Sequence, residues 1–138
     1  MLRRRWPLVA ILAGGIALLA AAGFRLSPLW PGPALPPGAT RLHLTTEAPH
    51  LFPTLACPAA LLAPARVAAA GDELVLLRED TNEPLEVVFP SRWAAWRRDG
   101  RAELVTRDGV VIAREGDVIE GLGGGGGDDA FHVCIIGS

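Results

Sequence analysis

The chain has 138 residues, 50% hydrophobic, 20% charged and 6% aromatic, which is enough for one small domain and no second core. All 13 basic residues are arginine, and from residue 24 onward 10 arginines stand against 15 acidic residues, a net charge of about −5. A negative net charge repels the phosphate backbone of a nucleic acid, so the sequence predicts no nucleic-acid partner.

The N-terminus carries an export pattern. Arg3, Arg4 and Arg5 precede an apolar run of 19 residues, 6–24, which is long enough to cross roughly 30 Å of hydrocarbon as a helix. The arginines favour a cytoplasmic N-terminus and place the remaining chain outside the cytoplasm. We expect residues 1–26 to form either a single-pass anchor in the cell membrane or a signal peptide whose cleavage leaves a secreted protein.

Residues 27–40 form a second region, which contains five prolines. Such density removes backbone donors and favours an extended polyproline conformation, so this region is expected to be a spacer. Residues 41–138 are then the folding unit, an extracytoplasmic β domain.

Short β-branched runs separated by turn residues predict strands in this unit. The expected strands are residues 65–70, 74–78, 85–89, 102–106, 110–114 and 131–136. Asp-Gly pairs such as Asp99 and Gly100 supply the positive φ angles of tight hairpins. Six to seven short strands favour an all-β fold, a small OB-like barrel or a sandwich. The run of five glycines, 123–127, is expected to be a mobile loop.

Two short segments bracket the domain. Cys57 and Pro58 stand at one end, and His132, Val133 and Cys134 at the other. In these ends the chain resembles short exported bacterial domains of uncharacterised function, over roughly residues 57–137. The resemblance implies one all-β domain and brings with it no activity and no binding residue.

Cys57 and Cys134 are the only cysteines, and the chain is exported toward an oxidising space. We expect them to form a disulfide that closes the domain, with inert free thiols as the alternative. No C-x-x-C pair and no zinc-spaced histidine cluster suggests another role.

Candidate chemistry is sparse. His43, Glu47 and His50 have helical metal-site spacing, but Pro49 and the strand-like alternation around them argue against convergence. We expect no metal, no cofactor and no enzymatic activity. The alternative is a small hydrolase that uses Ser91 and His132, although no nucleophile elbow surrounds Ser91.

The most aromatic and basic stretch of this acidic domain is the predicted binding face. Its residues are Arg92, Trp93, Trp96, Arg97 and Arg98. On a strand the two tryptophans would point to opposite sides, and on a helical turn to the same side. We therefore expect an interaction module with the cell membrane as one partner, through its N-terminal helix, and an envelope protein, peptide or glycan as the other.

Overall fold

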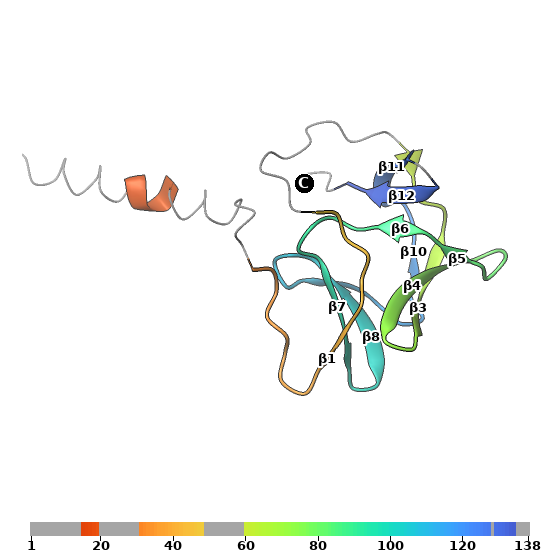
Figure 1. Ribbon diagram of the computed structural model, residues 1–138, viewed down its shortest axis with the longest axis horizontal. Helices are drawn as coiled ribbons and strands as arrows, with labels where there is room; N and C mark the ends of the chain where they lie inside the picture. Colours follow the sequence, from red (N-terminus) through yellow and green to blue (C-terminus); the bar gives the residue numbers. More distant parts are fainter. Residues whose placement is uncertain (1–14, 20–30, 49–59, 128, 135–138) are drawn as a thin grey trace, which may run out of the picture. The chain divides into compact units, whose positions relative to one another are not determined.

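Short strands in three sheets make up about half of the described chain, which comprises residues 15–19, 31–48, 60–127 and 129–134 of the computed structural model (Figure 1). The chain divides into two units between Trp30 and Pro31, and all the strands belong to the second. The predicted all-β class is confirmed.

The first sheet has the order β1-β7-β8-β9 and is antiparallel throughout. Its strands are β1 (Thr40–Leu42), β7 (Ala94–Arg98), β8 (Arg101–Val105) and β9 (Val111–Arg114). The β7–β8 hairpin turns at Asp99 and Gly100, whose φ angles of 52° and 78° are those that the Asp-Gly pair predicts.

The second sheet has the order β10-β3-β4-β5, again antiparallel. Its strands are β3 (Ala65–Ala70), β4 (Glu73–Arg78), β5 (Pro84–Leu85) and β10 (Val118–Ile119). Gly71 at the β3–β4 turn has a φ of 65° and lets the two strands pair along their whole length.

The third sheet has the order β2-β11-β12-β6, and β12 pairs with β6 in parallel. Its strands are β2 (Ala60–Leu61), β6 (Val87–Val88), β11 (Gly123–Gly127) and β12 (Ala130–Val133). The expected mobile glycine loop is therefore wrong, because the glycines pair with β12 from Gly124 to Gly127. Glycine fits position 124 because it has no side chain: a Cβ there would lie 2.6 Å from the Cε1 atom of Phe131.

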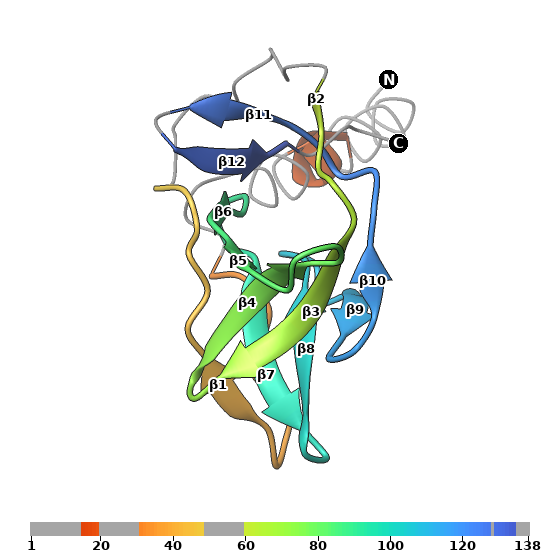
Figure 2. The ribbon, with the colours of Figure 1, turned by 90° about the vertical axis from the view of Figure 1, so that its right-hand side faces the viewer.

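The main core lies between the first two sheets, and Figure 2 shows the β3–β4 hairpin crossing in front of β7 and β8. Strand alternation directs every second side chain inward from each sheet. The largest fully buried side chains are Leu76, Leu104, Val67 and Val105.

Part of the predicted spacer contacts the β domain. A Cβ at Gly32 would lie 3.2 Å from the carbonyl oxygen of Arg92, and Ala39 packs against the buried cluster that contains Trp96. The second unit accordingly begins at Pro31, ahead of the predicted domain start at residue 41.

The predicted N-terminal helix falls mostly outside the described residues. Residues 15–19 are helical. Among the residues that the structure describes, no helix is long and apolar enough to cross a membrane.

Candidate functional site

The predicted binding face is divided between the two sides of strand β7. Trp93 packs at the margin of the main core, whereas Trp96 lies in a separate cluster on the other side of the sheet, as strand alternation predicts. We call this the outer cluster; it consists of Ala94, Trp96 and Val105, with Ala39 and Val111 packed against them. Trp96 is only 3% exposed, and a ring that is packed in a core does not present its faces to a partner.

Trp93 is half-buried and stacks on Phe89, with ring centroids 5.9 Å apart and an interplanar angle of 24°. Its Nε1 atom is buried and donates no hydrogen bond to any described residue. The ring borders a shallow groove of about 330 Å³, whose other lining residues include Arg41, His43 and Asp72.

The three arginines of the predicted face occupy different environments. Arg97 donates a 3.0 Å hydrogen bond to the carbonyl oxygen of Gly71, which ties it to the β3–β4 turn. Arg92 is half-buried and has a φ of 68°. Arg98 lies on the outer side of the sheet, in an ion pair with Glu103. The stretch therefore does not form one continuous face.

Glu103 is the buried charged residue in the described part of the domain and was not singled out from the sequence. Its Oε2 atom accepts a 2.8 Å hydrogen bond from Nε1 of Trp96. Its Oε1 atom accepts two bonds of 3.1 Å, from Nη2 of Arg98 and Nε of Arg114. The signal that identifies it is one acidic residue inside an otherwise apolar strand, Ala102 to Val105.

The environment of Glu103 keeps it charged. Burial alone would raise the pKa of its carboxyl group, because desolvation disfavours the anion. The hydrogen bonds from Trp96, Arg114 and Arg98 outweigh this effect and hold the pKa below its ordinary value. The carboxylate is thus a fixed negative charge beneath two arginines.

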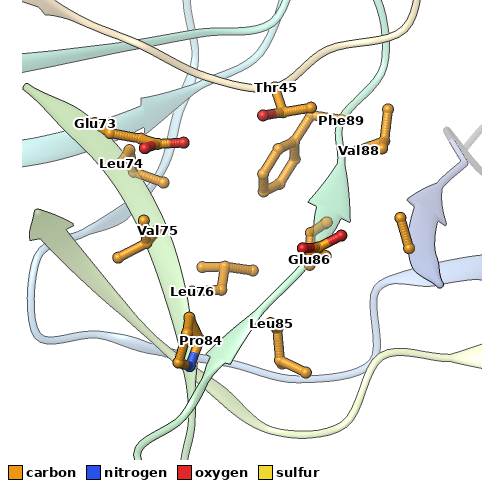
Figure 3. Close-up of a pocket in the computed structure, with 12 residues that line it drawn as sticks. Thr45, Glu73, Leu74, Val75, Leu76, Pro84, Leu85, Glu86, Val88 and Phe89 are labelled. Atoms are coloured by element: carbon orange, nitrogen blue, oxygen red, sulfur yellow. The ribbon is translucent and has the colours of Figure 1, made fainter.

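A cavity of about 420 Å³ lies where β4 and the chain of β5 and β6 separate (Figure 3). The two segments pair at Leu76 and Leu85, and then the chain leaves β4 so that Val87 can pair with Phe131 in β12. Figure 3 shows the side chains of β4 along one wall and those of residues 85–89 along the other.

The first segment of the domain closes the remaining end of this cavity. The carbonyl oxygen of His43 accepts a 3.0 Å bond from the amide of Leu74 on one wall. The carbonyl oxygen of Thr45 accepts a 2.9 Å bond from the amide of Phe89 on the other. Backbone hydrogen bonds therefore connect this segment to both walls of the cavity.

Most of the cavity lining is aliphatic or aromatic, but each wall contributes one carboxylate. Glu73 on β4 lies 3.6 Å from Nδ1 of His43, measured from its Oε1 atom. Glu86, on the opposite wall, makes no ion pair or side-chain hydrogen bond with any residue in the described ranges. No arginine lines this cavity, so its charge is negative.

With this geometry in view, we compared the chain with known proteins. No match was found. Neither the family models, nor the curated proteins, nor the solved structures gave a significant one. The resemblance to short exported bacterial domains therefore stays an expectation, and the site is argued from this chain alone.

His132 and Glu47 lie 85 positions apart in the sequence but in contact, with Nδ1 of His132 3.2 Å from Oε1 of Glu47. The pair is partly exposed. Ser91, the predicted nucleophile of the hydrolase alternative, occupies the turn before Trp93 and makes no hydrogen bond with His132. The sequence offered no sign that Glu47 would be the acid beside His132.

The residues of the considered metal site do not meet in the described chain. His43 pairs with Glu73, whereas Glu47 pairs with His132. His50 lies outside the described residues. Among those that are described, no group of three metal-ligating side chains converges.

One half of the predicted disulfide is described. Cys134 follows β12, its amide donates a 2.9 Å bond to the carbonyl oxygen of Gly123, and it is disulfide-bonded. Cys57 lies outside the described residues. The pairing of Cys57 with Cys134 stays a prediction.

Proposed function

We propose that the protein is a non-enzymatic binding module that works outside the cytoplasm, held at the cell membrane by its N-terminal segment or released by cleavage. The support for this location is the sequence pattern of three arginines followed by the apolar run 6–24. The proposed function requires neither a metal nor a cofactor.

The binding site in this proposal is the cavity between β4 and β6. The observation that carries it is a cavity lined mostly by aliphatic residues, with a carboxylate on each wall and no cation in its lining. Largely apolar cavities with a few placed polar groups are the usual sites of ligand binding. Because the exposed carboxylate of Glu86 has no partner among the described residues, a ligand cation would give it one.

The proposed ligand is a basic side chain of a peptide or an envelope protein. Arginine and lysine combine an aliphatic stem with a charged end, which matches aliphatic walls with acidic groups. A neutral or anionic glycan would leave the carboxylate of Glu86 without a counter-charge. The proposal includes the fold type: we propose a small OB-like barrel or sandwich, in which a ligand binds at the open part of a sheet.

The test is titration of the full-length protein, purified in neutral detergent micelles, with a short peptide that contains two arginines. Binding should be saturable. Glu86→Gln should weaken it about tenfold, because the bond to a charged partner loses its charge. Glu120→Gln is the matched control, since Glu120 is an exposed acid outside the cavity lining.

A peptide with neutral citrulline in place of arginine separates charge from shape. It should bind at least about tenfold more weakly than the arginine peptide. Equal affinity for the two peptides, or equal effects of Glu86→Gln and Glu120→Gln, would contradict the proposed site.

The second candidate is the small hydrolase that uses Ser91 and His132. The observation in its favour is the Glu47 carboxylate 3.2 Å from His132, because an acid in that position orients an imidazole as a base. Hydrolysis of an ester substrate that is lost in both Ser91→Ala and His132→Ala would establish it. Activity unchanged in either variant would exclude this mechanism.

A further inference from the structure

The first sheet exposes positive charge over a buried negative one. In the register of the sheet, Trp96 is the partner of Glu103, and Glu103 is the partner of Arg114. Cross-strand partners project from the same side of a sheet, so these side chains form a row across the outer side. Arg41 continues the row on β1, as the partner of Trp96.

The carboxylate of Glu103 fixes two guanidinium groups beside each other. Arg98 and Arg114 both donate to its Oε1 atom, each at 3.1 Å. Two nitrogens bonded to one oxygen cannot be further apart than the two bonds laid end to end. The arginines are therefore held at short range in spite of their like charges.

The buried carboxylate of Glu103 and the guanidinium groups of Arg98 and Arg114 differ in their exposure to solvent. The side chain of Glu103 is 5% exposed, compared with 37% for Arg98 and 52% for Arg114. An approaching solute thus meets the guanidinium groups and not the carboxylate. Arg66 provides the contrast, because its partner Glu79 is itself 40% exposed and neutralises it at the surface.

Most guanidinium donors at this place remain unused. A guanidinium group has five N–H donors, and Glu103 takes one bond from each arginine. Neither Arg98 nor Arg114 has a further side-chain acceptor within the described ranges. The nearby carboxylate of Asp117 accepts from the backbone amide of Arg114 and makes no ion pair with its guanidinium group.

We propose that Arg98 and Arg114, held in place by Glu103, form a binding site for a tetrahedral oxyanion, the phosphate or sulfate group of a small molecule. Two planar groups with parallel free donors match such an anion, which accepts several bonds at once. The site goes beyond the proposed function, because it lies on the first sheet and takes the opposite charge from the cavity.

The binding experiment follows the side-chain N–H signals of arginine by NMR in the full-length protein in neutral detergent micelles, with inorganic phosphate as the probe. The signals of Arg98 and Arg114 should shift saturably. Arg98→Gln should weaken binding about tenfold, because it removes charge-assisted bonds. Arg66→Gln, which removes the same charge from an exposed ion pair, should leave the affinity unchanged.

Arg114→Lys guards against a loss of folding, since it keeps a cation for Glu103 but removes the planar donors. It should melt near the wild-type temperature and still bind phosphate more weakly. Sulfate should compete, whereas acetate should compete poorly because it lacks the tetrahedral oxygens. Binding to vesicles of anionic phosphatidylglycerol, but not of phosphatidylcholine, whose phosphate is neutralised by its own choline, would place the accepted phosphate on a lipid headgroup.

Three results would overturn the proposal. They are a phosphate titration without saturation, shifts confined to other arginines, and an equal loss of affinity in Arg98→Gln and Arg66→Gln. Glu86→Gln should not alter phosphate binding, so failure of this site and failure of the cavity are distinguishable.

Discussion

Trp96 and Glu103 face each other across the β7–β8 hairpin, and the indole Nε1 of Trp96 donates a 2.8 Å hydrogen bond to Oε2 of Glu103. Both residues are 3% exposed. A buried carboxylate is tolerated only when its oxygens are bonded, and the indole supplies one of the three donors. The outer cluster, through Trp96, and the pair of Arg98 and Arg114 therefore both depend on Glu103.

Trp96→Phe should cost more stability than Trp93→Phe. Both substitutions remove a similar volume, but only Trp96 donates a hydrogen bond to a described residue, whereas Nε1 of Trp93 donates none. The difference in the free energy of unfolding should be about 1–3 kcal/mol, the usual effect of leaving a buried acceptor unsatisfied. Urea unfolding followed by far-ultraviolet circular dichroism measures it, and equal losses would contradict the role of this bond.

Glu103 should contribute to the pH dependence of stability. Its pKa is lowered in the folded state, so its contribution is fully present above the unfolded pKa and is lost as the pH falls through the folded pKa. Glu103→Gln should cost about 3 kcal/mol at neutral pH, because the two arginines lose their buried counter-charge. That cost should shrink as the pH falls below the ordinary glutamate pKa and through the lowered pKa of the folded state, where the wild-type carboxylate also becomes protonated.

Urea unfolding at a series of pH values tests this prediction. Glu79→Gln is the control, because Glu79 pairs with Arg66 at the surface and such pairs contribute about 0–1 kcal/mol. A cost of Glu103→Gln that is independent of pH would refute the assigned charge.

Gly124→Ala and Gly126→Ala should have opposite effects. A Cβ at Gly124 would press on the carbonyl oxygen of His132 and lie 2.6 Å from Cε1 of Phe131, whereas a Cβ at Gly126 would meet no atom within 4 Å. We expect Gly124→Ala to lower the unfolding free energy by about 1–3 kcal/mol, the usual cost of overpacking. Gly126→Ala should raise it by about 0.5 kcal/mol, because alanine restricts the unfolded chain. Thermal melting of both variants decides, and destabilisation by Gly126→Ala would contradict the open position.

Reduction of the predicted Cys57–Cys134 disulfide should lower the melting temperature by more than about 10 °C, since closing a loop of this length contributes about 4 kcal/mol. Cys57→Ser and Cys134→Ser should be equally destabilised, and the double variant no further. Intact-mass analysis after alkylation, on protein purified without reductant from its natural compartment, checks the bridge. Two alkylated thiols would show that it is absent.

The N-terminal segment should retain the protein in the membrane fraction. The apolar run 6–24 is the reason, because it is long enough to span the hydrocarbon layer. Cell fractionation with N-terminal sequencing measures the outcome. A soluble product that begins near Gly23 or Phe24 would replace the anchor with a cleaved signal peptide.

Local signals in the sequence were sufficient for two of the turns. Strands Ala65–Ala70 and Glu73–Arg78 match the predicted hairpin, and the β7–β8 turn falls on the predicted Asp-Gly pair. Alternation also predicted that Trp93 and Trp96 would point to opposite sides once their segment is a strand.

Glycines 123–127 mark where local reasoning failed. Glycine has low strand propensity, so its run predicted a loop. Pairing with β12 and the approach of the Phe131 ring to Gly124 made it a strand. Packing by a distant segment outweighed the propensity of the residues themselves.

The all-β class, several tight turns and the alternation of side chains along the predicted strands follow from the amino-acid sequence alone. These depend on neighbours in the chain, through allowed φ angles and a period of two. The burial of Glu103 beneath Arg98 and Arg114 became visible only in the folded sheet. The pairing of distant segments, and with it the contact between Glu47 and His132 across 85 positions, depends on the tertiary structure. Such contacts form between segments far apart in the chain, where register and packing decide and local preference has no influence.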